Sequence, residues 1–269
     1  MVTTDLDVLL TDVAAESAEL ERLVGPLSPE RWRQPTPAEG WTVAHQIGHL
    51  AWTDEVATMA ADDARTGGTA FTALLTEAAP RMATFVDEAA AEAAATSPAE
   101  LLARWRRARG GLATALRDIP DDVKVPWFGP PMRPRSMVTA RLMETWAHGQ
   151  DIADALGVRR EPTDRLHGIA HIGVRTRDFA YTMRAVPVPE VEFRVELTAP
   201  SGELWTWGPV DARQRITGPA LDFCLLVTRR RHPHDLAVRA IGQQAAEWLT
   251  IAQAFAGPAG KDRAAGQFG

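Results

Sequence analysis

The sequence predicts an α+β protein in which a helical bundle is followed by a small domain of mixed strands and helices. Apolar residues recur at helical spacing through the first part of the chain, and proline and glycine residues separate the helical segments. After Pro187 and Pro189 the pattern changes to alternating apolar and charged residues, which is typical of half-buried strands. We therefore expect the bundle over residues 1–187 and the α+β domain over residues 188–269.

Local signals fix the expected helices of the first part. Ser97 and Glu100 form a capping-box pattern, and Pro98 occupies the first helical position, where its missing N–H would have no partner anyway. Pro80 should break an alanine-rich segment, and Thr42 is a suitable N-cap. The expected helices span residues 4–24, 42–61, 70–95, 98–119 and 136–156. Apart from the segment that Pro80 interrupts, these are four main helices with modest connections, which predict a bundle whose sites are built from inward-facing side chains.

A further expected helix over 164–184 completes the first domain. Residues 191–197 alternate as a strand, and the turn at Ser201-Gly202 returns the chain as its hairpin partner over 203–208. We expect a third strand over 213–217 and helices over 220–227 and 235–255.

Composition restricts the class of function. The chain has 29 basic and 35 acidic side chains, so its net charge of −6 argues against nucleic acid or an anionic membrane as the main partner. Cys224 is the single cysteine, which excludes an internal disulfide framework and a cysteine-rich zinc site. The first 25 residues are acidic rather than basic, and no apolar run is long enough to span a bilayer. We therefore expect a cytoplasmic protein that acts on a small molecule.

Glu144 and His148 form the most informative spacing in the chain. Residues four apart on a helix share one face, so their side chains can bind one ion. The alternative interpretation is an ordinary surface Glu–His pair. Only a third ligand from elsewhere in the chain would favour a metal site over it. His45 and His49, one turn apart on an earlier helix, can supply that ligand. His167 also has a partner one turn away, His171, but the pattern offers no carboxylate and favours a surface or packing role.

Two motifs resemble the metal-binding domain of mycothiol-dependent maleylpyruvate isomerases, which belong to the DinB-like superfamily of helical bundles. The motifs are Trp41-Thr42-Val43 followed by His49-Leu50, and Arg141-x-x-Glu144-x-x-x-His148-x-x-Asp151. The resemblance covers residues 1 to about 185 and implies a DinB-like four-helix bundle. It also implies that His49, Glu144 and His148 are the metal ligands and that His45 lies outside the ligand set.

Two imidazoles and one carboxylate leave open positions on a divalent ion, as in catalytic sites. Zinc is the default, although the same ligands accept nickel, iron or cobalt. An ion of this kind lowers the pKa of a bound thiol and makes its sulfur nucleophilic. Cys224 lies in an apolar helix and is expected to be structural, so the thiol must be external. Asp151 is expected to orient His148 or to carry a proton; the alternative is an exposed charge near the helix end.

The last part of the chain resembles the small sterol-carrier-like domain of the same family, in which an arginine after a glycine helps to bind mycothiol. Here Thr228 stands where the family has glycine, which leaves open which arginine serves. The two candidates for binding the thiol are Arg229 and Arg81, which follows the break at Pro80. The resemblance implies a mycothiol-dependent isomerase or S-transferase. The alternatives are a non-thiol metalloenzyme that uses metal-bound water and a metal-bearing protein that binds an apolar ligand.

Overall fold

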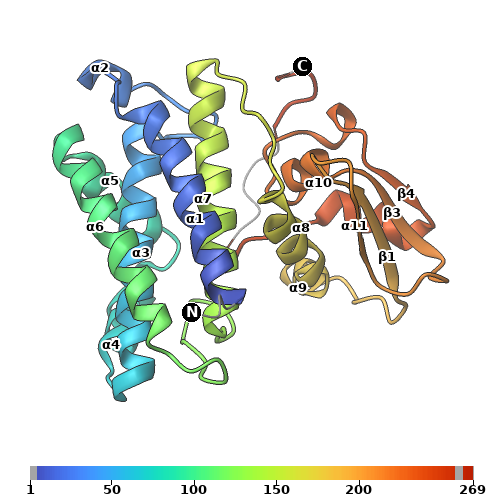
Figure 1. Ribbon diagram of the computed structural model, residues 1–269, viewed down its shortest axis with the longest axis horizontal. Helices are drawn as coiled ribbons and strands as arrows, with labels where there is room; N and C mark the ends of the chain where they lie inside the picture. The colour runs from blue at the N-terminus through green and yellow to red at the C-terminus, as the bar shows by residue number, and fades with distance from the viewer. Residues whose placement is uncertain (1–4, 258–262, 269) are drawn as a thin grey trace. The chain divides into compact units, whose positions relative to one another are not determined.

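The computed structural model describes residues 5–257 and 263–268. The chain divides into two compact units, one up to Val158 and the other from Arg159 onward (Figure 1). In the described residues, none of the helices is both long enough and apolar enough to cross a membrane.

The first unit is a bundle built around one central helix, α3 (Figure 1). This helix packs against α5, α6 and α7, and α1 packs against α7. The helices of this unit are α1 (Asp5–Val24), α2 (Pro29–Trp32), α3 (Val43–Thr66), α4 (Ala70–Ala78), the 3₁₀ turn η1 (Ala79–Arg81), α5 (Phe85–Ala94), α6 (Pro98–Arg117) and α7 (Pro134–Leu156). The predicted helical bundle is therefore confirmed.

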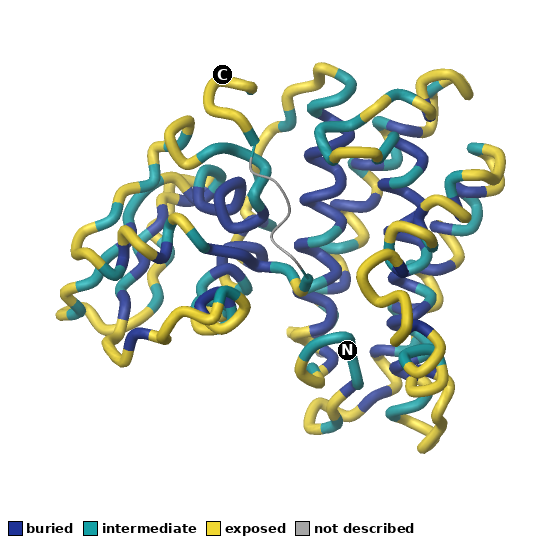
Figure 2. Tube along the Cα trace, turned by 180° about the vertical axis from the view of Figure 1, so that it is seen from behind, coloured by how far each residue is buried: buried dark blue, intermediate teal, exposed yellow. Residues whose placement is uncertain are grey.

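Buried residues run along the length of α3 and α7 (Figure 2). The close approach of α5 to α3 depends on Gly48, because a Cβ at this position would lie only 2.9 Å from Cβ of Ala93. A side chain here would push the two helices apart next to His49. The position before the candidate ligand is therefore fixed by packing.

Several helix ends follow the predicted local signals, whereas α3 continues to Thr66 rather than ending at 61, and α7 begins at Pro134 rather than at 136. Ser97 caps α6 by accepting a hydrogen bond from the Glu100 backbone N–H, and Glu100 accepts one from Ser97 N–H in return. The chain breaks between α4 and α5 at the turn that contains Pro80. Gly157 takes a left-handed conformation at the end of α7, with φ of 67°, as a C-terminal glycine commonly does. Thr42 is the N-cap of α3.

The second unit holds a four-stranded sheet in the order β2-β1-β3-β4. Strands β1 and β3 are parallel, and the edge strands are antiparallel to their neighbours. Its elements are α8 (Leu166–Arg175), α9 (Arg177–Met183), β1 (Phe193–Thr198), β2 (Leu204–Trp207), β3 (Gln214–Pro219), α10 (Ala220–Val227), the 3₁₀ turn η2 (Pro233–Asp235), β4 (Arg239–Ile241) and α11 (Gln243–Ile251). Its core includes the buried Phe223 and Trp248, whose rings contact each other. The chain thus has the predicted α+β class.

Helix α8 packs against α10 within the second unit. Gly173 makes this packing possible, because a Cβ there would lie 2.8 Å from a methyl group of Val227. The division by contacts therefore falls after Val158, earlier than the expected boundary at 187.

Two details of the second unit differ from the prediction. The helix expected over 164–184 is two helices, α8 and α9. The prediction of one helix over 235–255 was wrong for residues 239–241, which form the strand β4. This short segment pairs with β3, and that long-range contact decides its conformation.

Candidate metal centre

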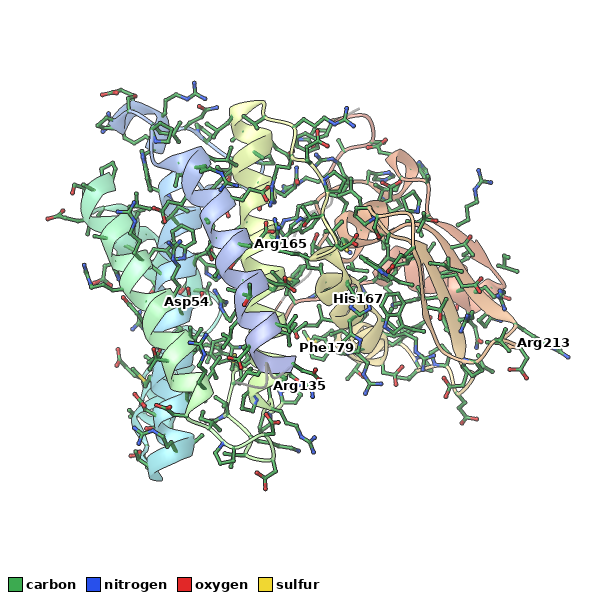
Figure 3. All side chains as sticks on the ribbon, viewed as in Figure 1. Asp54, Arg135, Arg165, His167, Phe179 and Arg213 are labelled. Atoms are coloured by element: carbon green, nitrogen blue, oxygen red, sulfur yellow. The ribbon has the colours of Figure 1, made fainter. Side chains whose placement is uncertain are left out.

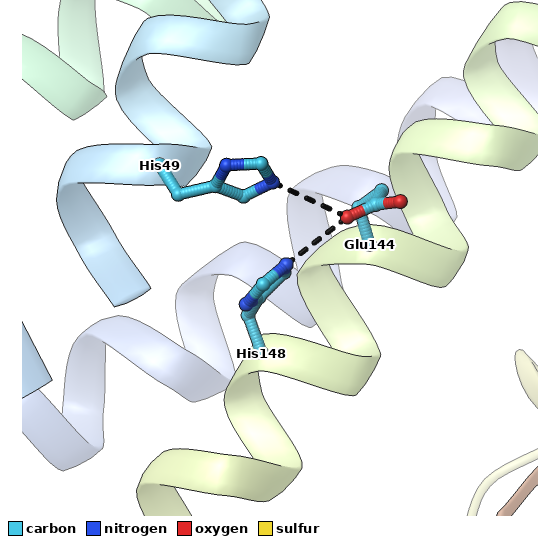
Figure 4. A group of neighbouring side chains, drawn as sticks. All are labelled: His49, Glu144 and His148. Atoms are coloured by element: carbon cyan, nitrogen blue, oxygen red, sulfur yellow. Dashed lines mark hydrogen bonds and ion pairs between the residues drawn. The ribbon is translucent and has the colours of Figure 1, made fainter. Parts of the chain in front are cut away.

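Two helices of the bundle bring His49, Glu144 and His148 together (Figure 4). Glu144 and His148 lie one turn apart on α7, and His49 faces them from α3. Oε2 of Glu144 lies 3.0 Å from Nε2 of His148 and 3.5 Å from Nε2 of His49. One ligand atom from each side chain lies within 4.8 Å of the other two. The ligand atoms of the expected i,i+4 pair and of the third side chain thus converge on one place.

The spacing fits a divalent ion. Ions such as zinc bind nitrogen at about 2.0–2.1 Å, which places tetrahedral ligand atoms about 3.3 Å apart. The two measured separations, 3.0 and 3.5 Å, bracket that value. The side chains of His49 and His148 are each 11% exposed and that of Glu144 is 22% exposed, so the cluster is largely enclosed but still reached by solvent. Its donor atoms are those of an open, catalytic type of site.

The carboxylate of Glu144 is held in its ionised form. Burial raises the pKa of Glu144, but hydrogen bonds from His148 and His49, together with their positive charge, outweigh that effect. The pKa of Glu144 is therefore well below its usual value. An ionised carboxylate is the form that binds a metal cation.

Trp41 covers the cluster with its indole ring. The ring stacks on His148, with centroids 5.8 Å apart and planes 17° apart, and lies 5.3 Å from the ring of His49. Nε1 of Trp41 donates a hydrogen bond of 3.0 Å to Oδ1 of Asp87 on α5. Both the stacking and this bond hold Trp41 in place, so it forms one wall of the site. The residue was part of the predicted motif, but its contact with both histidines was not predicted.

Gln46 is the main residue of the site that the sequence interpretation missed. It is fully buried on α3, and its Oε1 contacts Nδ1 of His148. Its Nε2 donates a hydrogen bond of 2.9 Å to Oγ1 of Thr36. A glutamine one turn before a candidate ligand on the same helix is a weak signal, because an amide carries no charge and binds no metal preferentially.

Among the described residues, three polar pairs connect α3 and α7. They are Gln46 with His148, His49 with Glu144, and Asp54 with Arg141. Because the residue numbers rise along α3 as they fall along α7, the two helices run antiparallel. The middle pair, His49 with Glu144, belongs to the candidate metal site.

The pair between Asp54, which Figure 3 labels, and Arg141 is an ion pair of two buried side chains. Nε of Arg141 lies 2.8 Å from Oδ1 of Asp54, and their side chains are 3% and 7% exposed. Burial raises the pKa of Asp54, and the charge and hydrogen bond of Arg141 oppose that effect in part. Nη2 of Arg141 is buried without a hydrogen-bond partner among the described residues.

His45 lies outside the cluster and has a structural role. Its Nδ1 accepts a hydrogen bond from the backbone N–H of Thr42, in the N-terminal capping box of α3. Asp151 is fully buried on α7, so the alternative of an exposed charge near the helix end was wrong. Its expected part in catalysis stays a prediction.

Arg81 lies at the surface in the turn η1 and forms ion pairs with Glu77 and Glu88. It lines a small cavity of about 200 Å³ together with Trp52 and Phe85. The described contacts do not include one between Arg81 and the metal cluster. Its expected role in binding the thiol stays a prediction.

Arg229 follows the last turn of α10 in a left-handed conformation, with φ of 58°. Its N–H bonds the carbonyl of Leu226, and the N–H of Arg230 bonds that of Leu225, so the two residues end the helix. This conformation favours glycine, and an arginine here is unusual. Thr228 is buried before it and completes α10.

Cys224 is fully buried in α10, and its thiol donates a 3.5 Å hydrogen bond to the carbonyl of Leu166 on α8. Burial raises its pKa well above the usual value. The buried position agrees with the expected structural role. His167, which Figure 3 labels, and His171 are exposed on α8, and the ring of His167 stacks on that of Trp207 in β2.

Comparisons with known proteins agree with this architecture. Two proteins of Mycobacterium tuberculosis, from two strains and both described as uncharacterized, are each 57% identical to the chain over 254 residues, which is 94% of this chain and 97% of theirs. Crystal structures of mycothiol-dependent maleylpyruvate isomerase and of a histidine-to-alanine mutant match with TM-scores of 0.59 and 0.61. Both matches have 18% sequence identity and cover 88% of this chain and 95% of the other, so they show the shared fold.

Two family models match separate parts of the chain. Residues 189–240 match the model described as wyosine base formation. Residues 13–153, more than half of the chain, match the model described as the mycothiol maleylpyruvate isomerase N-terminal domain. That second match contains all three side chains of the cluster. The chain therefore belongs to the family of the mycothiol maleylpyruvate isomerase N-terminal domain.

Proposed function

We propose that the chain is a metal-dependent enzyme of the mycothiol-dependent isomerase or S-transferase type. The observation that carries the proposal is the cluster of His49, Glu144 and His148 in a member of this family. These three side chains would hold a divalent ion, with zinc as the first choice and nickel, iron or cobalt as alternatives. A cytoplasmic location belongs to the proposal, because the chain has a single, buried cysteine.

When bound, such an ion lowers the pKa of a thiol at an open position, so that its sulfur is nucleophilic near neutral pH. The thiol must come from outside, because burial keeps the thiol of Cys224 protonated and inaccessible. Trp41 and the largely enclosed position of the cluster would limit the access of water to a bound sulfur. The chain's own residues thus provide an apolar wall, the ring of Trp41, and a fixed set of atoms that could bind the ion.

In the isomerase form of the reaction, the thiolate sulfur adds to one carbon of a conjugated double bond. The electron pair of that bond moves toward the conjugated carbonyl oxygen, and the former double bond becomes free to rotate. Return of the electron pair expels the thiolate, so the thiol is regenerated and the product differs only in geometry. In the S-transferase form, the sulfur stays on the carbon and the product takes up a proton.

Asp151 is our candidate for carrying that proton, because it is buried on α7 three residues after His148. Nδ1 of His148 contacts Gln46, which leaves the orienting role to the amide. Asp151→Asn should lower kcat with metal content unchanged. A variant with unaltered kcat would remove Asp151 from the reaction.

Mycothiol is polar and needs contacts beyond the metal, for which arginines are suitable donors. In the family pattern a glycine precedes the arginine. Here the glycine-favouring, left-handed position is held by Arg229, so we assign the following residue, Arg230, to the place of that arginine. Arg81 is the other candidate, although it already forms ion pairs with Glu77 and Glu88.

Metal analysis of the purified protein tests the ligands. We expect one divalent ion per wild-type chain and loss of that ion in Glu144→Ala, because the carboxylate is shared by both histidine contacts. Glu92→Ala is the matched control, since this residue lies exposed on α5, outside the cluster. Equal metal content in the wild type and Glu144→Ala would refute the three-ligand assignment.

Calorimetric titration of mycothiol into the metal-loaded protein tests the thiol. Loss of a buried, charge-assisted contact in Arg230→Ala should weaken binding by about 1.5–3 kcal/mol, or roughly ten- to a hundredfold. Arg231→Ala is the control, because its guanidinium lies 4.3 Å from the ring of Phe268. Binding that is unchanged in Arg230→Ala but weakened in Arg81→Ala or Arg229→Ala would move the contact to that residue. No binding heat at millimolar mycothiol would end the thiol proposal and favour the hydrolytic alternative.

A further inference from the structure

We infer that Gln46 is a positioning residue that fixes which nitrogen of His148 carries the proton and thereby aims the other nitrogen at the metal. The inference rests on the proposed metal site. It depends on a chain of hydrogen bonds that begins at a backbone carbonyl, passes through Thr36, and reaches His148 through the amide of Gln46.

The carbonyl of Trp41 determines the direction of the first bond. Oγ1 of Thr36 lies 2.9 Å from this carbonyl oxygen. A carbonyl oxygen can only accept, so the hydroxyl of Thr36 must donate its single proton to Trp41. The backbone N–H of Thr36 donates to the same oxygen at 2.8 Å, which holds the two residues together. The hydroxyl oxygen of Thr36 is then available only as an acceptor.

The second bond fixes the amide of Gln46. The amide group facing Thr36, 2.9 Å away, must be the NH₂ group, because the hydroxyl has no proton left to donate. If the amide were rotated by 180°, its oxygen would face the oxygen of Thr36 with no proton between them. Gln46 is fully buried, so water cannot compensate for such a mismatch without entering the core. The carbonyl oxygen of Gln46 is therefore directed toward His148.

The last bond sets the proton on His148. Its Nδ1 contacts the carbonyl oxygen of Gln46, which can only accept, so Nδ1 must carry a proton. Nε2, which donates its own proton to Glu144 when no cation is present, is then the nitrogen that can give up that proton and offer a lone pair to a cation. This is also the nitrogen that lies 3.0 Å from Oε2 of Glu144, within the ligand cluster. The histidine thus presents the correct nitrogen to the cluster without turning its ring, and only the proton donated to Glu144 has to leave.

His49 differs from His148 in this respect. Its Nδ1 is buried and has no hydrogen-bond partner among the described residues. Ligand histidines usually donate their other ring N–H to an acceptor, and loss of such a partner typically weakens metal binding ten- to a hundredfold. We therefore assign the positioning effect to His148 alone, and substitutions of Gln46 should change metal binding through this histidine.

The first test compares metal affinities by competition with a chromophoric chelator. Gln46→Leu, which removes the acceptor at similar volume, should bind zinc roughly ten- to a hundredfold more weakly than the wild type. Gln46→Glu keeps an acceptor for Nδ1–H and should bind within a few-fold of the wild type. Thr36→Val removes the hydroxyl that orients the amide and should weaken binding, whereas Thr36→Ser should not. Thermal unfolding of the metal-free proteins reports whether each variant is folded.

The second test reads the proton directly. Long-range ¹H–¹⁵N spectra of the wild type distinguish a proton on Nδ1 from one on Nε2, both without metal and with zinc. We expect a proton on Nδ1 of His148 in both samples. Because the metal-free sample is informative, a protein that binds no zinc would refute the metal site yet still test the role of Gln46.

Several results would overturn the inference. They are an unprotonated Nδ1 of His148, a folded Gln46→Leu with wild-type affinity, or equal losses in Gln46→Leu and Gln46→Glu. If Gln46→Leu fails to fold, the two Thr36 variants decide the question, because Thr36 is only half-buried and its replacement disturbs the core less. Equal affinity in Thr36→Val and Thr36→Ser would then refute the relay.

Discussion

Removal of the Asp54 carboxylate should leave the guanidinium of Arg141 buried without its counter-charge. The two side chains are 7% and 3% exposed, and Nη2 of Arg141 is already buried without a hydrogen-bond partner among the described residues. An unpaired buried charge cannot recover its lost hydration. Breaking such a pair typically lowers the free energy of unfolding by about 3–5 kcal/mol, and we expect Asp54→Ala to fall in that range.

Urea denaturation of the full chain, followed by far-ultraviolet circular dichroism, measures this change. The surface pair of Arg33 with Glu30 is the control, because its atoms are 3.9 Å apart and both side chains are 73% exposed. Glu30→Ala should leave the unfolding midpoint unchanged, since water already solvates both charges. The contrast between the two variants isolates the effect of burial.

A double variant separates charge from packing. Asp54→Leu combined with Arg141→Met removes both charges and should be more stable than Asp54→Ala, because no buried charge remains. Stability of Asp54→Ala within about 1 kcal/mol of the wild type would refute the reasoning. So would a double variant that is less stable than the single one.

Three further predictions concern the metal, the end of α10 and the cysteine. Chelation should leave the helical circular dichroism signal in place, because the bundle has a core of its own; collapse of that signal would make the metal structural. Arg229→Gly should raise the free energy of unfolding by about 0.5–1 kcal/mol, since glycine adopts the left-handed conformation without strain, while Arg231→Gly should not; a less stable Arg229→Gly would contradict this. Cys224 should resist alkylation in the native protein and react after denaturation, because burial raises the pKa of its thiol; rapid native labelling would refute this.

The candidate ligands could be predicted because their signal is local or part of a motif. Glu144 and His148 share a helix face by spacing alone, and the resemblance to a family selected His49 rather than His45. Gln46 could not be found in this way. Its importance depends on Thr36 and on a backbone carbonyl in the loop before α3, and sequence spacing does not reveal such a contact.

The same distinction applies to the fold. Capping residues such as Ser97 and Gly157 act within a few residues of themselves, so the helix ends that they mark agree with the structure. That α8 belongs to the second unit depends instead on the close approach of Gly173 to Val227, which is distant in sequence. The strand β4 likewise forms through pairing with β3. Local patterns do not contain this information.

The three polar pairs between α3 and α7 have a consequence for how the two helices can slide. Apolar ridges and grooves repeat along a helix, so packing alone tolerates several axial offsets. A slip of one residue moves a helix by about 1.5 Å along its axis, whereas a metal site tolerates errors of only about 0.5 Å. Since Gln46 and Asp54 lie on opposite sides of His49 along α3, a slip in either direction would break both of their pairs together. The two outer pairs therefore act as stops that hold the helices at the one offset where the ligand atoms meet.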